Sequence, residues 1–199
     1  RRDPRPQRAP LGATRPTPVG RGPEGKDQSL VIRAPRPPVR PVPEDIGNIK
    51  RIFWVDDRPE SVGPLARALG LPLGGWCPRG RRAEDGPIDP SYPLVETPDL
   101  DYAQRTEWNV RDSDATLVLT RGRPSGGTAF TIAVARRMGR PLLVLDLDES
   151  PAPAELRGWV ESSGLGVLNV AGPRESQRPG IGASARAFLE EALRPLASP

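Results

Sequence analysis

Residues 116–145, TLVLTRGRPSGGTAFTIAVARRMGRPLLVL, contain two short apolar runs separated by a loop and a longer apolar segment. The runs 116–120 and 142–145 have the length and composition of strands that are buried on both faces. The segment from Thr128 to Met138 is long enough for a helix, and Gly139 is a typical helix end. This stretch therefore predicts a strand–helix–strand unit of a parallel sheet.

The same alternation continues on both sides of this unit. Strands are expected over 52–55, 71–76, 92–96 and 167–170, and helices over 61–69, 101–112 and 154–162, with a C-terminal helix whose apolar stripe spans 185–192. Ser61 and Asp101 are the expected N-caps of two of these helices. Because strands alternate with helices, we expect an α/β protein with a three-layer Rossmann-like fold and a mostly parallel sheet.

The N-terminal quarter has a different composition. Residues 1–48 hold 11 of the 27 prolines and show no helical or alternating apolar period. Such a segment buries too little apolar surface to offset the entropy of ordering it. We therefore expect a disordered Pro/Arg-rich extension over 1–48 and a Rossmann-like domain over 49–199. A mispredicted start and an arm that binds RNA, a membrane or a proline-recognition domain are the other interpretations of this extension.

The charge is equally uneven. The 199-residue chain has 29 basic and 25 acidic residues, a net charge of +4, yet residues 1–51 hold 12 basic and 5 acidic residues, a net charge of +7. The remaining 17 basic and 20 acidic residues give the rest of the chain a net charge of −3. Basicity is therefore a property of the N-terminal quarter, and we expect no nucleic acid partner for the folded domain.

Two residue counts exclude whole classes of site. The chain has no histidine, which excludes Ser-His-Asp and Cys-His catalysis. Its one cysteine, Cys77, excludes internal disulfides and multi-cysteine metal sites. No run approaches the roughly 18–20 consecutive apolar residues of a membrane span, so we expect no membrane partner. Since nothing marks an oxidising compartment, we expect a cytoplasmic protein.

Polar and glycine-rich loops follow three of the expected strands, at 77–86, 121–128 and 171–177. Ligands of open parallel sheets bind beyond the carboxyl ends of the strands, so these loops are the candidate site. Gly126, Gly127 and Thr128 open a helix, where free amides and the helix dipole attract anions, and this favours a phosphate. The alternative is a tight loop in which Thr128 only caps the helix.

Two further segments have side chains suited to a ligand. Arg79, Arg81 and Arg82 carry guanidiniums that suit phosphate or carboxylate oxygens, or else belong to a solvated loop paired with Glu84 and Asp85. The helix over 101–112 presents polar residues around a thin apolar stripe, which indicates either the wall of a site or an exposed helix with a Glu107–Arg111 pair. The residues around the stripe are Gln104, Arg105, Trp108, Asn109 and Asp112. Asn and Asp side chains suit the edge of a heterocycle, and the Trp108 ring suits stacking on one.

Cys77 is a weak candidate for binding a soft metal centre, and a small buried residue is its other interpretation. Asp146 and Asp148 follow the strand over 142–145, and they suit either a ribose or magnesium contact or a polar strand exit.

Several of these segments together resemble the putative molybdenum carrier family. The resemblance covers roughly residues 70–194, and the segments that carry it are 74–88, 96–97, 101–114, 126–128, 168–176 and 179–180. It implies a Rossmann-like fold related to the lysine-decarboxylase-like nucleotide-binding proteins. It also implies molybdenum cofactor (molybdopterin), a pterin with a phosphate and a metal dithiolene, as ligand, with a nucleoside monophosphate as the alternative.

The resemblance further implies a homo-oligomer, with molybdoenzymes or cofactor-synthesis proteins as partners. The ligand-binding residues expected on these grounds are Arg79, Gly80, Arg81, Arg82, Arg105, Trp108, Asn109, Gly126, Gly127, Thr128, Gly172 and Arg174. One segment departs from the family. Family members usually have a glycine-rich loop after the first strand, whereas residues 54–61 here read WVDDRPES, without glycine. Either part of the anion site is lost or this coding region is misread.

Three functions follow from these residues. The first is a binding protein that holds molybdenum cofactor, or a similar phosphorylated heterocycle, for storage or transfer without catalysis. The second is an enzyme that hydrolyses the N-glycosidic bond of a nucleoside monophosphate, with Glu107 or Glu84 as the carboxylate. The related enzymes carry a glutamate in the helix after the glycine loop, and residues 129–135 contain none. The third is a non-catalytic nucleotide sensor.

Overall fold

The computed structural model of this chain describes residues 51–54 and 63–196. The extension expected over 1–48, the helix cap expected at Ser61 and the segment 54–61 apart from Trp54 lie outside the described residues.

The centre of the described domain is a parallel sheet of five strands in the order β2-β1-β9-β7-β8, and every neighbouring pair is parallel. Its strands are β1 (Arg51–Trp54), β2 (Leu73–Gly74), β7 (Ala115–Thr120), β8 (Leu142–Asp146) and β9 (Val167–Ala171). All six residues of β7 are buried, as the continuous apolar run predicted.

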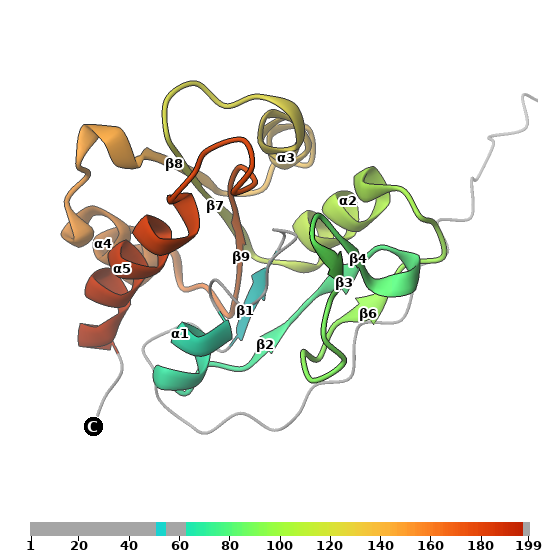
Figure 1. The fold of residues 1–199 in the computed structure, drawn as a ribbon. Helices are drawn as coiled ribbons and strands as arrows, with labels where there is room; N and C mark the ends of the chain where they lie inside the picture. Colours follow the sequence, from blue (N-terminus) through green and yellow to red (C-terminus); the bar gives the residue numbers. More distant parts are fainter. Residues whose placement is uncertain (1–50, 55–62, 197–199) are drawn as a thin grey trace, which may run out of the picture. The chain divides into compact units, whose positions relative to one another are not determined.

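Helices cover both faces of this sheet (Figure 1). On one face α1 (Gly63–Ala68), α4 (Pro153–Ser163) and α5 (Ile181–Leu193) pack on the larger apolar cluster, which includes Leu117 and Leu119 of β7. On the other face α2 (Tyr102–Asp112) and α3 (Gly126–Arg137) pack near Val118 and Leu142. Alternate residues of β7 thus point to opposite layers, and the predicted three-layer α/β fold is confirmed.

The chain between β2 and α2 leaves the main sheet. The single strand expected over 71–76 is wrong, because Gly75 at φ 130° turns the chain between β2 and β3 (Trp76–Cys77). Strand β3 pairs instead with β6 (Val95–Glu96), which is shorter than the strand expected over 92–96. Between them lie the 3₁₀ turn η2 (Arg79–Arg81) and the hairpin of β4 (Arg82–Ala83) with β5 (Gly86–Pro87).

Local signals explain the remaining elements. Asp101 is the N-cap of α2, as expected, since its carboxylate accepts a hydrogen bond of 2.9 Å from the Ala103 amide. Helix α3 begins two residues earlier than expected, at Gly126. The 3₁₀ turns η3 (Leu147–Glu149) and η4 (Arg194–Leu196) follow β8 and α5. In the described part of the chain, no helix has both the length and the apolar character needed to cross a membrane.

Candidate anion-binding cavity

A cavity of about 310 Å³ opens at the carboxyl ends of β7 and β9, on the side of the sheet where α2 and α3 pack. Its walls come from the first turns of α2, the first turns of α3 and the segment that follows β9. The lining residues are Tyr102, Ala103, Arg105, Thr106, Gly126, Gly127, Thr128, Phe130, Thr131, Ala171, Gly172, Arg174 and Gln177. The cavity therefore lies where a parallel sheet binds its ligands.

The amino end of α3 supplies backbone donors to this cavity. Ser125 is the N-cap by position, but its side chain makes no capping hydrogen bond. The first amides of a helix have no partner within the helix, and here the Ser125 side chain does not accept from them either. Gly126 and Gly127 are both exposed, so an anion can approach these amides closely. The partial positive charge of the helix end adds to the attraction.

Thr128 is the most informative residue of the wall. It is only 3% exposed, and its hydroxyl has no hydrogen-bond partner among the described residues. Thr131, one turn later in the same wall, is equally buried, but its hydroxyl donates to the Gly127 carbonyl at 3.0 Å. Buried hydroxyls are nearly always paired, so the one on Thr128 needs an explanation. An oxygen atom of a bound anion would provide the missing partner.

Two guanidiniums stand on the same aromatic ring in the opposite wall. The Arg174 guanidinium lies 4.9 Å from the centre of the Tyr102 ring, and that of Arg105 lies 5.5 Å from it. Both distances are within the range of a cation–π attraction, so the half-buried ring helps to hold both arginines in place. Arg105 is only 7% exposed. The cavity thus combines two fixed positive charges with the donors of α3.

The segment after β9 passes very close to β7. A Cβ atom on Gly172 would lie 2.8 Å from the Leu119 carbonyl oxygen, which is too close for any side chain. Glycine at this position therefore allows the strand exit to approach β7 and to form the floor of the cavity beside Ala171.

Half of the residues expected to bind a ligand line this cavity, and the segment Arg79–Arg82 does not belong to its described lining. The Arg81 guanidinium donates instead to four backbone carbonyls of the loop that follows β5, those of Ile88, Asp89, Tyr92 and Leu94, at 2.9–3.2 Å. Arg79 and Arg82 are exposed, and the Gly80 amide donates to the Glu96 carboxylate at 2.5 Å. Arg81 therefore stabilises this loop rather than facing the cavity.

Trp108 and Asn109 also lie outside the described lining. Asn109 is fully buried and pairs with the backbone of Trp76: it accepts from the amide at 2.8 Å and donates to the carbonyl at 3.0 Å. The Trp108 ring packs edge-on against Trp76 with centroids 4.7 Å apart, and Arg111 lies 4.9 Å from the centre of the Trp108 ring. These residues join α2 to β3.

The remaining candidates have their own positions. Cys77 is 1% exposed in β3, outside the described lining, and burial raises the pKa of its thiol above the ordinary value of 9.0. The Asp146 carboxylate accepts from the amides of Gly122 and Asp148, both at 3.0 Å, so it caps a strand exit. Among the described residues, no group of three or more His, Cys, Asp or Glu side chains could hold a metal ion.

Some lining residues were missed by the sequence reasoning, namely Tyr102, Ala103, Thr106, Phe130 and Thr131. A signal was available in the helical spacing. Tyr102, Arg105 and Thr106 are three and four residues apart and share one face of α2, and Thr131 lies one turn after Gly127. Extending the expected contacts by one turn would have found all of these except Ala103.

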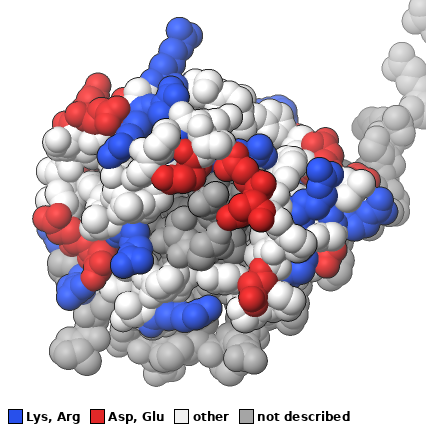
Figure 2. Space-filling model, viewed as in Figure 1, with Lys and Arg blue, Asp and Glu red and all other residues white. Residues whose placement is uncertain are grey.

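One face of the described domain is mixed in charge. Figure 2 shows basic and acidic side chains interspersed over the face in view. Nucleic-acid-binding domains typically show a continuous basic patch or stripe. The face in view has no such stripe, and the two guanidiniums beside Tyr102 line a cavity of about 310 Å³, a size that suits a small anion.

Comparison with known proteins identifies one matching protein family and one similar solved structure. Residues 63–193 match the model of a family described as the circularly permutated YpsA SLOG family. The chain is similar in structure to a putative molybdenum carrier protein from Syntrophus aciditrophicus SB, whose crystal structure was determined at 1.45 Å resolution. The two share 35% identity with a TM-score of 0.69, over 74% of this chain and 96% of the other. A search of curated proteins gives no match.

Proposed function

We propose that the cavity binds a small phosphorylated heterocycle, because the chain belongs to the circularly permutated YpsA SLOG family and its motifs resemble those of the molybdenum carrier proteins. The protein would hold this ligand for storage or transfer. Molybdenum cofactor is the first candidate, since the similar solved structure is that of a putative molybdenum carrier protein. The single observation that carries the proposal is the buried Thr128 hydroxyl without a described partner, at the uncapped start of α3.

The described residues suit the phosphate of such a ligand. The amides of Gly126 and Gly127, together with the Thr128 hydroxyl, would donate to its oxygens, and Arg105 and Arg174 would neutralise its charge. The cofactor brings its own dithiolene sulfurs to the metal, so the protein needs no thiolate ligand. This agrees with a Cys77 thiol that lies outside the described lining. Partners among molybdoenzymes or cofactor-synthesis proteins belong to the same proposal.

The hydrolase considered above needs a carboxylate at the ribose. Of the two candidates, Glu107 pairs with Arg137 at 2.6 Å, and Glu84 accepts a hydrogen bond from Ser176. Neither belongs to the described lining, in which no residue is acidic. We therefore favour binding without turnover, and release of adenine from AMP is the measurement that would argue for the enzyme.

The experiment uses the full chain and two probes. Molybdenum cofactor released from a donor enzyme is mixed with the protein, the mixture is gel-filtered, and pterin fluorescence and molybdenum are measured in the protein peak. AMP and adenosine are titrated by calorimetry in parallel. We expect near-stoichiometric retention of one phosphorylated probe, a weaker affinity for it in Arg174→Ala that calorimetry still measures, and no change in Arg82→Ala, whose exposed arginine is the matched control. Retention of neither the cofactor nor AMP by the wild type would refute the proposal.

A further inference from the structure

The cavity is built from two segments that leave neighbouring strands. One follows β7 and carries the start of α3, and the other follows β9 and carries Arg174 and Gln177. If a ligand contacts both segments, its affinity depends on the distance between them. The hydrogen bonds that fix this separation therefore matter to binding even where they lie outside the cavity.

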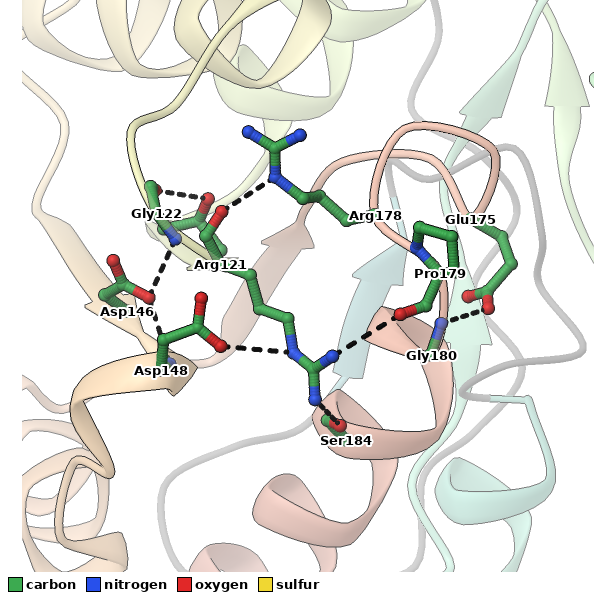
Figure 3. Close-up of polar contacts among 10 residues, drawn as sticks. Arg121, Gly122, Asp146, Asp148, Glu175, Arg178, Pro179, Gly180 and Ser184 are labelled. Atoms are coloured by element: carbon green, nitrogen blue, oxygen red, sulfur yellow. Dashed lines mark hydrogen bonds and ion pairs between the residues drawn. The ribbon is translucent and has the colours of Figure 1, made fainter.

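Two arginines outside the described lining join these segments, as Figure 3 shows. The Arg178 side chain donates from Nε to the Arg121 carbonyl at 2.9 Å. In the opposite direction, the Arg121 guanidinium donates to the Ser184 hydroxyl at 2.7 Å and to the Pro179 carbonyl at 3.4 Å. Each segment thus holds the other through a side chain and a main-chain group. We call this set of three hydrogen bonds the Arg121–Arg178 crosslink.

Both ends of the crosslink are themselves fixed. Asp148 lies 3.6 Å from the Arg121 Nε, and the neighbouring Gly122 amide donates to Asp146 at 3.0 Å, so the exit of β7 is tied to the exit of β8. At the other end, the Glu175 carboxylate accepts from the amides of Gly180 and Gly182 at the start of α5. The crosslink therefore connects two anchored segments rather than two free loops.

The crosslink acts on the cavity through one turn of backbone. The Arg174 carbonyl accepts from the amides of both Gln177 and Arg178 at 3.0 Å, so residues 174–178 form a closed turn. Arg178 lies at one end of this turn and is bonded to the exit of β7. Arg174 lies at the other end, with its guanidinium on the Tyr102 ring in the cavity. Movement of one end moves the other.

From these contacts we infer that Arg121 and Arg178 are positioning residues, which hold the Arg174 guanidinium at the distance from the start of α3 that one bound phosphate requires. The inference rests on the proposed function, because it concerns the same cavity. It assigns a role to two arginines that neither the motif comparison nor the cavity lining includes.

A double-mutant cycle tests this role by titrating AMP and molybdenum cofactor into the full-length wild type, Arg178→Ala, Arg174→Ala and the double variant. We expect Arg178→Ala to weaken binding of the phosphorylated probe about tenfold, the size of one hydrogen bond to a charged group. In the Arg174→Ala background the same change should have almost no effect, since the group being positioned is gone. Arg178→Lys, which keeps one donor for the Arg121 carbonyl, should recover part of the affinity.

The controls separate positioning from general damage. Arg186→Ala removes an exposed arginine from α5 and should leave affinity unchanged, and thermal unfolding is measured for every variant. If Arg178→Ala does not fold, Ser184→Ala removes one acceptor of the crosslink, and a severalfold loss that likewise disappears in Arg174→Ala is expected. An equal loss in both backgrounds, or no loss in the wild-type background, overturns the positioning role alone. A wild type that binds neither probe overturns the proposed function and this role with it.

Discussion

Replacing Thr128 by valine should raise the stability of the free protein while weakening its binding of a phosphate. Valine keeps the β-branched shape and removes only the hydroxyl. Thr128 is only 3% exposed, and its buried hydroxyl has no hydrogen-bond partner among the described residues. A buried polar group left unpaired costs roughly 1–3 kcal/mol. Thr128→Val should therefore stabilise the free protein by about 1 kcal/mol or more.

Binding should change in the opposite direction. A hydrogen bond to a charged group contributes about 1.5–3 kcal/mol, so its loss should weaken the affinity for a phosphorylated ligand by about 10- to 150-fold. The opposite signs of these two effects follow directly from a hydroxyl whose partner would be the ligand.

Thr131→Val is the matched control, because Thr131 is a buried threonine in the same wall whose hydroxyl already has a partner. Losing its bond to the Gly127 carbonyl should destabilise the protein by about 1 kcal/mol. Urea unfolding at a constant m-value gives both stabilities, and calorimetry with AMP and gel filtration with molybdenum cofactor give the affinities. A Thr128→Val variant that is less stable than the wild type, or that binds both probes unchanged, would refute this account of the α3 end.

Three further predictions concern other positions. Gly127 occupies a helical position where an added Cβ would meet no atom within 4 Å, so Gly127→Ala should stabilise the fold by up to about 1 kcal/mol. Because Gly127 lines the cavity, the added methyl should also weaken retention of the ligand. Gly158→Ala, at an equally open position in α4, should stabilise the fold by a similar amount and leave retention unchanged. Equal retention by both variants would contradict an anion at the α3 end. Arg81→Lys should lower stability by about 2 kcal/mol in urea unfolding, because a lysine cannot reach all four carbonyls, yet it should leave AMP affinity within twofold; a large loss of affinity would place Arg81 in the site after all. Because burial raises the pKa of Cys77, its contribution to stability is full below the unfolded value of 9.0 and is lost as the pH rises through the higher folded value. Wild type should therefore lose more stability than Cys77→Ala between pH 8 and a pH about one unit above that unfolded value, and parallel losses would count against the shift.

The fold could be predicted because its signals are local. The burial of β7 could be predicted from six consecutive apolar or threonine residues. The end of α2 before it and the start of α3 after it could be predicted from a few adjacent residues. The glycine-rich start of α3 was predicted for the same reason, since a glycine pair after a buried strand is a pattern within one segment. Besides the shortened strand over 92–96, the exception was the strand over 71–76. A single positive φ at Gly75 sent its second half to a different sheet, and the apolar pattern is the same in either case.

The arginines and Asn109 show why the rest of the site could not be predicted. An amide or guanidinium that suits a ligand also suits backbone groups, and residue type alone does not separate the two. Asn109 pairs with the backbone of Trp76, 33 positions away in the sequence, and Arg81 collects the carbonyls of a loop. Tyr102 acquires its importance from Arg174, which is brought to it only by the packing of α2 beside the exit of β9.

The same ambiguity explains how an arginine-rich chain can have a small site. Only two of the 29 basic residues are lysines, and a guanidinium offers five donors in a rigid plane, which suits the crosslinking of carbonyls that no helix or strand satisfies. Arg81, Arg121 and Arg178 are used in this way, whereas Arg105 and Arg174 stand in the cavity. Arg174 and Arg178 are one turn apart, and their guanidiniums serve the cavity and the backbone respectively. Exchange for lysine would therefore change the affinity for the ligand in two different ways. At residue 174 it would alter the direct contact with the ligand, and at residue 178 it would alter the position of Arg174.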